Sequence, residues 1–154
     1  MDEGRLGILK ADIDRQVGII EQIYKKIEQR SEDYEVNEER MESLAYQLHN
    51  LYCAFEDLME IVIVEFENRV SEKSNWHIKL LRRMSEQIPN IRPALFSQEN
   101  FLLLDELRAF RHWFRHAYSY KIEPEKLEIV LRKTAKLREK YKADITGFLK
   151  ELCE

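Results

Sequence analysis

Chain-breaking residues are scarce in this sequence, which has only four glycines and three prolines among 154 residues. Sheet-and-turn architectures need more of these residues at their turns, and disordered chains are also rich in them. A chain of this length buries roughly 70% of its unfolded surface when it folds, and 44% of its residues are apolar. The sequence therefore predicts an all-α fold, with residues 1–154 forming a single domain.

Apolar residues recur at steps of three and four along most of the chain, which is the spacing of one buried helix face. Together with capping residues and prolines, this pattern predicts five helices. They run from Glu3 to about Glu32, from a cap at Asn37 through residues 58–66, from about Asn75 to Ile88, from a cap at Ser97 to about Tyr120, and from Pro124 to the C-terminus. Because residues 58–66 are apolar nearly all round, we expect that helix to contact two partners.

Several classes of protein do not fit the sequence. Cys53 and Cys153 have no CxxC or Cys/His spacing, so neither a disulfide framework nor a zinc site is indicated. The first residues lack the basic leader and apolar core of a signal peptide, and no stretch approaches the ~20 apolar residues of a membrane span. We expect a cytoplasmic protein with no membrane span, no metal and no cofactor.

The net charge of -4 hides a division between the two parts of the chain. Residues 1–70 have 8 basic and 17 acidic side chains, whereas residues 71–154 have 17 basic and 12 acidic ones. If one part contacts nucleic acid, it is the second. Within it, the run from Arg132 to Lys142 has six bases and one acid, which fits either a solvated helix face or a secondary contact with an RNA backbone.

The predicted fourth helix has an apolar face and a face rich in arginine and histidine. At about 100° per residue, one half of its circumference carries Leu103, Leu107, Ala109, Phe110, Trp113, Phe114 and Ala117, and the other half carries Arg108, Arg111, His112, Arg115, His116 and Tyr118. We expect Trp113 and Phe114 to pack in the core. An ordinary solvated face mixes acids with bases, yet no acid occurs between Ala109 and Glu123.

Three arginines lie within eight residues of this helix, Arg108, Arg111 and Arg115. Their positive charges repel one another, at a cost of some tenths of a kcal/mol per pair, unless an anion or another chain neutralises them. A phosphate backbone would relieve the repulsion, because the planar guanidinium binds phosphate bidentately and stays charged. Histidine adds a side chain that exchanges protons near neutral pH. This face therefore indicates a site for a phosphate backbone, with Arg108, His112 and Arg115 as candidate supporting residues.

The string Arg111-His112-x-x-x-His116-x-Tyr118 resembles the R-(polar)-x-x-x-H-x-Y signature of HEPN-domain ribonucleases. Among these, it resembles most the HepT-like toxins of bacterial and archaeal HepT/MntA toxin-antitoxin pairs. The chain length, the helices throughout and the place of the motif near the end of the penultimate long helix are similar as well. A bare R-x4-H is common by chance, and the added polar residue and tyrosine make the match more specific. The resemblance implies a HEPN-like bundle of about five helices.

The resemblance also implies an activity and partners. It implies a metal-independent endoribonuclease that acts as a homodimer on RNA, tRNA among the candidates, and that an MntA-like nucleotidyltransferase antitoxin neutralises. The motif implies catalytic roles for Arg111 and His116 and AMPylation of Tyr118, with Tyr120 as the alternative acceptor. His112 occupies the polar position, where Asn or Asp is also frequent, so a catalytic and a structural role both stay open.

The chemistry of RNA cleavage fits these residues. In-line attack by the 2′-OH needs a proton acceptor, stabilisation of charge on the phosphorus and protonation of the leaving 5′ oxygen. His116 is the candidate acid or base, and Arg111 the candidate charge stabiliser. On a helical wheel these two lie about 140° apart, and a second copy of the helix across a twofold axis would bring both into one groove. We expect residues 58–66 and the fourth helix to form the dimer contact, and Tyr118 to lie within about 20° of Arg111.

Other interpretations stay open at this point. Arg111 and Arg115 fit a solvated or dimer-bridging face, and His116 fits a helix-end histidine next to the helix dipole. The i,i+4 pair of His112 and His116 has no accompanying Glu, Asp or Cys, so we expect no metal there. We expect His49 and His77 to be structural. The alternative functions are a non-catalytic helical HEPN module that docks a nucleotidyltransferase and presents substrate to it, and a plain helical interaction protein.

Overall fold

Five α-helices and one 3-10 turn make up the part of the chain that the computed structural model describes, residues 1–68 and 75–154. They are α1 (Glu3–Arg30), the turn at Tyr34–Val36, α2 (Glu38–Glu67), α3 (Trp76–Met84), α4 (Gln98–Arg115) and α5 (Pro124–Cys153). These residues contain no strand, which confirms the predicted all-α class. Over the same residues, none of the helices combines the length and the apolar character that crossing a membrane requires.

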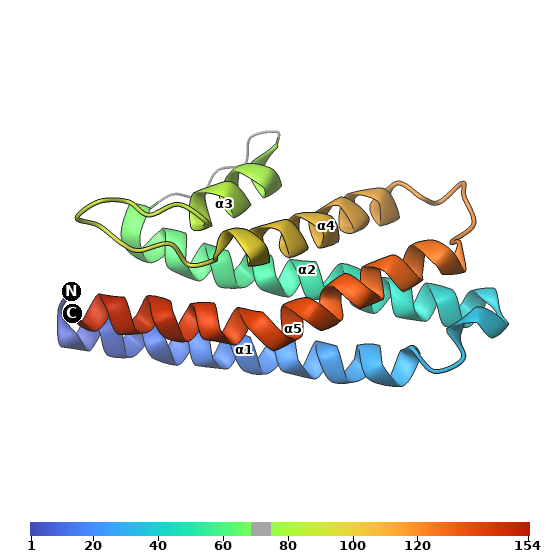
Figure 1. The fold of residues 1–154 in the computed structure, drawn as a ribbon, viewed down its shortest axis with the longest axis horizontal. Helices are drawn as coiled ribbons and strands as arrows, with labels where there is room; N and C mark the ends of the chain where they lie inside the picture. Colours follow the sequence, from blue (N-terminus) through green and yellow to red (C-terminus); the bar gives the residue numbers. More distant parts are fainter. Residues whose placement is uncertain (69–74) are drawn as a thin grey trace.

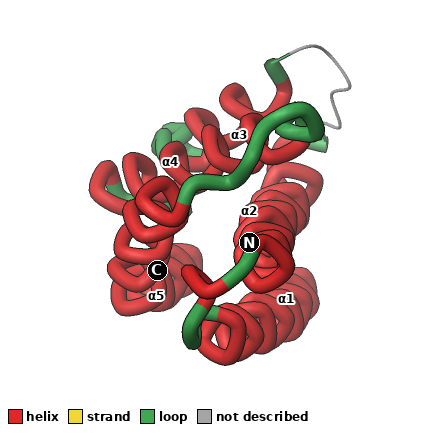
Figure 2. The backbone as a smooth tube through the Cα atoms, turned by 90° about the vertical axis from the view of Figure 1, so that its right-hand side faces the viewer, coloured by secondary structure: helices red, strands yellow, loops and turns green. Residues whose placement is uncertain are grey.

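Four long helices form a bundle, and the short α3 covers part of it (Figure 1). α1 packs on α2, α2 on α4, α4 on α5, and α5 on α1. α3 contacts α2 and α4 near the end of the bundle where α2 finishes, and the view along the bundle in Figure 2 shows it outside the four-helix arrangement. α4 runs from there toward the other end of the bundle, and its last turns lie beside residues 49–53 of α2 (Figure 1).

The predicted caps define where α2, α4 and α5 begin. The side chains of Asn37 and Ser97 accept hydrogen bonds from the backbone N–H groups of Arg40 and Asn100, and Pro124 opens α5. Each cap satisfies an N–H group that has no partner inside its helix. The predicted apolar stripe of α2 is buried over its whole length, from Met41 to Val62, which confirms the spacing argument.

The second half of α2 is the centre of the core. Leu58 and Val62 are completely buried, and α2 contacts α1, α3, α4 and α5, so the expectation of at least two partners is confirmed. The same burial shows that the dimer contact predicted for residues 58–66 is wrong for four of them, Leu58, Met59, Val62 and Ile63, because the chain's own helices already cover these side chains. Ile61 and Phe66 are partly buried, and Val64 is exposed.

α3 is shorter than predicted, because it ends at Met84 instead of Ile88. The chain turns early so that Leu95 and Phe96 can enter the core, and the backbone N–H groups of both donate to the carbonyl of Met84. Arg92 stabilises this loop. Its side chain is fully buried, pairs with Glu67 at 2.9 Å, and donates to three carbonyls of residues 83–93.

α4 is also shorter than predicted, because it ends at Arg115 and not near Tyr120. His116 is the C-cap, and the hydrogen bonds tighten there: His116 donates to the carbonyl of Trp113, and Ala117 to that of Phe114. After Ala117 the next residues, Tyr118–Lys121, are exposed, so a longer helix would bury no further apolar surface. Residues 116–123 instead reverse the chain toward α5.

Candidate functional site

The end of α4 is oriented by three aromatic residues on its inner face. Phe110 is buried, and its ring lies 5.8 Å from that of Trp113 and 6.1 Å from that of Phe114. Trp113 and Phe114 are half-buried and pack against the core, in agreement with the prediction. Because this face points inward, the neighbouring His112 and Arg115 point outward and are exposed.

The structure brings His112 and His116 together. Their ring centroids are 4.8 Å apart, and both side chains are exposed. His116 is the residue that caps α4 and not a residue inside it, so the angle of about 140° expected on an ideal wheel does not apply to it. Two imidazoles at this distance can act on one bound group, because one can accept a proton while the other donates one.

Arg111 faces α2 and lies beside two residues that the sequence analysis did not assign to the site. Its Nε donates to the Sγ of Cys53 at 3.3 Å, and Sγ lies 3.9 Å from the Nε2 of His49. His49 and Cys53 are one turn apart on α2, where an i,i+4 pair shares one face. No spacing rule joins residues of α2 to residues of α4, so the sequence carries no signal for this contact.

His49 also contacts the aromatic residues of this region. Its ring is 5.6 Å from that of Phe114. Burial lowers the pKa of His49, and the positive charges of Arg111 and Arg115 lower it further, against an opposing hydrogen bond with Asn50. A neutral imidazole therefore lies beside the two arginines at neutral pH.

The arginine and histidine side chains at the end of α4 have no carboxylate partners among the residues that the structure describes. No acidic group of residues 1–68 or 75–154 forms an ion pair with Arg111, His112, Arg115 or His116. The basic run of α5 differs, because ion pairs with acidic residues are formed by Arg132, Lys133, Arg138, Lys140 and Lys142. This favours the solvated-face interpretation for that run and leaves the end of α4 as the cationic surface.

Arg108 differs from the other two arginines of α4. Its Nε lies 2.7 Å from a carboxylate oxygen of Asp105, three residues earlier in the same helix. The predicted supporting role of Arg108 toward RNA would therefore require exchanging this partner for a phosphate. Tyr52 of α2 is fully buried, and its hydroxyl has no hydrogen-bond partner among residues 1–68 and 75–154.

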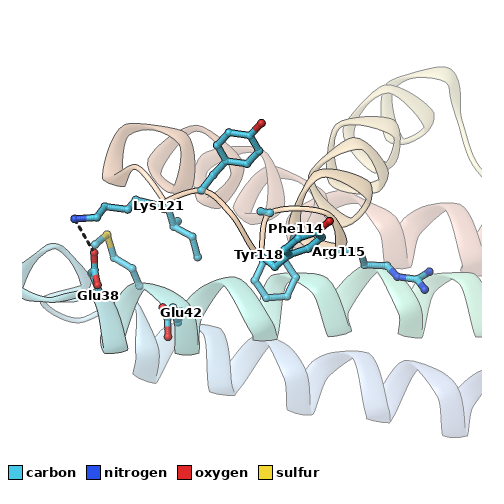
Figure 3. A pocket seen from close by; sticks show the side chains of 10 residues that line it. Glu38, Glu42, Phe114, Arg115, Tyr118 and Lys121 are labelled. Carbon is cyan, nitrogen blue, oxygen red and sulfur yellow. Dashed lines mark ion pairs between the residues drawn. The ribbon is translucent and has the colours of Figure 1, made fainter.

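Tyr118 lies in the turn after α4 and not on the helix face that carries Arg111. The expectation of about 20° on the wheel is wrong, because α4 ends three residues before Tyr118. The side chain is 91% exposed, and Tyr120 is 73% exposed. Tyr118 borders a hollow of about 410 Å³ that Arg115 also lines, so the two residues are neighbours although Tyr118 and Arg111 are not aligned (Figure 3).

His77 is paired with Glu56 of α2 at 2.6 Å between Nδ1 and Oε2, which is consistent with the structural role predicted for it. His49, for which the same role was predicted, lies instead beside Arg111.

In residues 1–68 and 75–154 no three His, Cys, Asp or Glu side chains are grouped as a metal ion would need.

The site thus joins guanidinium groups that have no carboxylate partner in the described residues, two neighbouring imidazoles and an exposed tyrosine at the end of α4. Comparison with known protein families matches residues 43–152, from the first turns of α2 almost to the end of α5, to the family described as HepT-like protein. The match contains all of the motif from Arg111 to Tyr118. Searches of curated proteins and of solved structures gave no match. The family match covers more than half of the chain and agrees with the fold and the motif, and the chain therefore belongs to the HepT-like family.

Proposed function

We propose that this protein is a metal-independent RNA endonuclease, the toxin of a toxin-antitoxin pair. The carrying observation is the group of arginine and histidine side chains at the end of α4, Arg111, His112, Arg115 and His116, which have no carboxylate partner in the described residues. Membership of the HepT-like family, which suggests a HEPN-type toxin, supports the proposal.

The proposed reaction is attack of the ribose 2′-OH on the adjacent phosphorus. The 2′-OH proton passes to a base, the bond from phosphorus to the 5′ oxygen breaks, and that oxygen takes a proton; the products are a 2′,3′-cyclic phosphate and a 5′-OH end. His116 is the proposed acid or base. Arg111 and Arg115 stabilise the charge that grows on the phosphate oxygens. His112, 4.8 Å from His116 between ring centroids, is placed to exchange the second proton.

We place the complete site at a homodimer interface. Arg111 is held against Cys53 of α2, whereas His116 lies beyond the end of the helix, and no hydrogen bond joins the two side chains in residues 1–68 and 75–154. Two copies of α4 related by a twofold axis would place Arg111 of one chain opposite His116 of the other.

A cleavage assay tests the chemistry. The purified protein is expected to cut RNA in EDTA and to leave 2′,3′-cyclic phosphate and 5′-OH ends. His116→Ala should abolish cleavage, while Lys136→Ala, which removes an exposed cation of α5, should not. A folded His116→Ala protein that cuts RNA at the normal rate, or cleavage that requires Mg²⁺, would contradict the proposal.

Mixing two inactive variants tests the shared site. In a heterodimer of Arg111→Ala and His116→Ala chains, a composite site would be intact at one of the two positions. Co-expression of the two variants should therefore restore a measurable part of the activity. No restoration in a mixture shown to contain heterodimers would mean that each chain builds its own site.

We further propose that a partner nucleotidyltransferase neutralises the protein by transferring AMP from ATP to Tyr118: the phenolic oxygen forms a bond to the α-phosphorus and gives up its proton, and pyrophosphate leaves. The exposure of the hydroxyl-bearing side chain and the position of Arg115 beside it support this choice, because a phosphodiester there would bring negative charge to the cationic surface. Co-expression with the partner should add AMP-sized mass increments at Tyr118, with Tyr120 as the alternative acceptor. An active Tyr118→Phe protein that the partner still silences without modification would show that neutralisation occurs by occlusion.

A further inference from the structure

The hollow beside Tyr118 has a composition that phosphate binding does not explain. It has a volume of about 410 Å³ and lies between the first turn of α2 and the turn after α4. Its walls include Glu38 and Glu42 from α2, and Phe114, Arg115, Tyr118 and Lys121 from the other side (Figure 3). It therefore combines aromatic rings, two carboxylates and two cations next to the proposed cleavage site.

The aromatic side chains at the hollow have surface that the fold does not use. Tyr118 and Tyr120 are among the most exposed large side chains of the described residues, and Phe114 is only half-buried. Exposed aromatic rings grouped at a concave surface indicate a binding site. Unpaired RNA bases stack on such rings, and each stacked base contributes binding energy without requiring a particular sequence.

The two carboxylates differ in their partners. Glu38 forms an ion pair with Lys121 at 3.5 Å, whereas Glu42, one turn further along α2, is exposed and forms no ion pair with any residue in the described ranges. In Figure 3 Glu42 lies between the Glu38–Lys121 pair and the rings of Phe114 and Tyr118. A carboxylate repels phosphate, so the hollow suits the base of a nucleotide, while Arg115 at its edge suits the phosphate.

We propose that this hollow binds one unpaired guanine of the RNA strand, next to the bond that is cut. The inference rests on the proposed ribonuclease function and adds the base that the site prefers. Guanine presents two neighbouring donors on its Watson–Crick edge, N1–H and the N2 amino group, which the two oxygens of the Glu42 carboxylate can accept together. Adenine, cytosine and uracil each place an acceptor beside a donor on that edge, and the carboxylate would repel it.

Cleavage of a random-sequence, single-stranded RNA library tests the preference. Sequencing of the product ends should show guanine at one fixed position beside the cut, enriched by about tenfold or more. A side chain that forms two hydrogen bonds to one base discriminates against the other bases by about this factor. Glu42→Gln should remove most of this enrichment without abolishing cleavage. Glu39→Gln is the matched control, because Glu39 is a neighbouring exposed glutamate of α2 that does not line the hollow.

A binding measurement separates failure of this proposal from failure of the proposed function. The cleavage-deficient His116→Ala protein is titrated with fluorescently labelled eight-nucleotide oligouridines that contain one guanine, one inosine or one adenine. We expect guanine to bind most tightly, inosine less tightly because it lacks the N2 amino group, and adenine least, with Glu42→Gln reducing the differences. This result would support the base site even if the wild-type protein cut no RNA.

Three outcomes would overturn the guanine site while leaving the ribonuclease function intact. They are cleavage with no base enriched beside the cut, enrichment that Glu42→Gln leaves unchanged, and a preference for adenine over guanine in both cleavage and binding.

Discussion

The two ends of α4 are built in opposite ways. At its beginning, the Ser97 side chain caps the helix, and Asp144 of α5 accepts hydrogen bonds from the Ser97 N–H at 2.7 Å and from the Asn100 side chain at 2.6 Å. Asn100 is only 1% exposed. At its end, no side chain of the described residues neutralises Arg115 or His116.

This difference separates stability from chemistry within one helix. The first turn has one buried polar side chain, Asn100, whose Nδ2 donates to Asp144, so loss of that acceptor leaves an unpaired donor inside the protein. At the end of the helix Arg115 and His116 are exposed and form no ion pair in the described residues, so they contribute little to folding and are available to an anion. We therefore expect substitutions at the beginning of α4 to lower stability and substitutions at its end to lower activity.

After the loss of cleavage expected for His116→Ala, the largest expected effect is that of Arg111→Ala on cleavage. Loss of one group that stabilises transition-state charge typically lowers the rate by about 10²–10³-fold. The free energy of unfolding should change by less than about 1 kcal/mol, since the lost contact is a weak one to Cys53 sulfur. Cleavage rates and denaturant midpoints measured on the same protein check this. A stable, fully active variant would remove Arg111 from the site.

Asp144→Ala should show the reverse pattern. It removes the acceptor of two hydrogen bonds and leaves the buried Asn100 amide without a partner, which costs about 2 kcal/mol, or roughly 4–8 °C in melting temperature. Cleavage at a temperature where the variant is folded should be unchanged. Asp144→Asn keeps an acceptor oxygen and should lose less. Normal stability with reduced cleavage would reverse the assignment of the two ends.

A smaller loss is expected for Ser97→Ala, which removes the cap of α4. Caps of this kind contribute about 1 kcal/mol, or roughly 2–4 °C in melting temperature for a chain of this size. Ser97→Asp replaces the acceptor and should restore most of the stability. A melting temperature that does not move in Ser97→Ala would mean that the bonds to Asp144 hold the helix start by themselves.

The smallest effect concerns His49 and pH. Because its pKa is lowered in the fold by burial and by Arg111 and Arg115, the unfolded chain takes up the proton first as the pH falls below the ordinary histidine value of 6.5. The contribution of His49 to the free energy of unfolding should therefore be constant above that pH. Below it this contribution should decline until His49 is protonated in the folded form as well. Denaturant unfolding of the wild type and His49→Gln between pH 7.5 and 5 measures this. Equal declines in both proteins would assign the pH dependence to other groups.

Most of the fold could be predicted from the sequence because its signals are local. The apolar stripe of α2, the caps at Asn37 and Ser97 and the start at Pro124 each depend on residues within a few positions of one another. The ends of α3 and α4 could not be predicted, because they depend on distant contacts. Arg92 must find Glu67 to hold the loop after α3, and the turn after α4 depends on where α5 begins.

The candidate site could be predicted in part for the same reason. Arg111, His112, His116 and Tyr118 lie within eight residues, and their residue types alone indicate phosphate chemistry. The contributions of α2 were missed. His49 and Cys53 lie about 60 positions before Arg111 in the sequence, and Glu42 meets Tyr118 only through the packing of α2 against the end of α4.

The early end of α4 has a consequence for any enzyme that modifies Tyr118. A tyrosine inside a helix is surrounded by its own backbone hydrogen bonds, and a transferase that needs an extended peptide in its active site would first have to unwind about one turn. Residues 117–123 follow the helix as turn and irregular chain, so they already have the form of an accessible loop. The modifying enzyme would meet a substrate that needs no local unfolding, and the bundle beneath would keep its stability while the loop is bound.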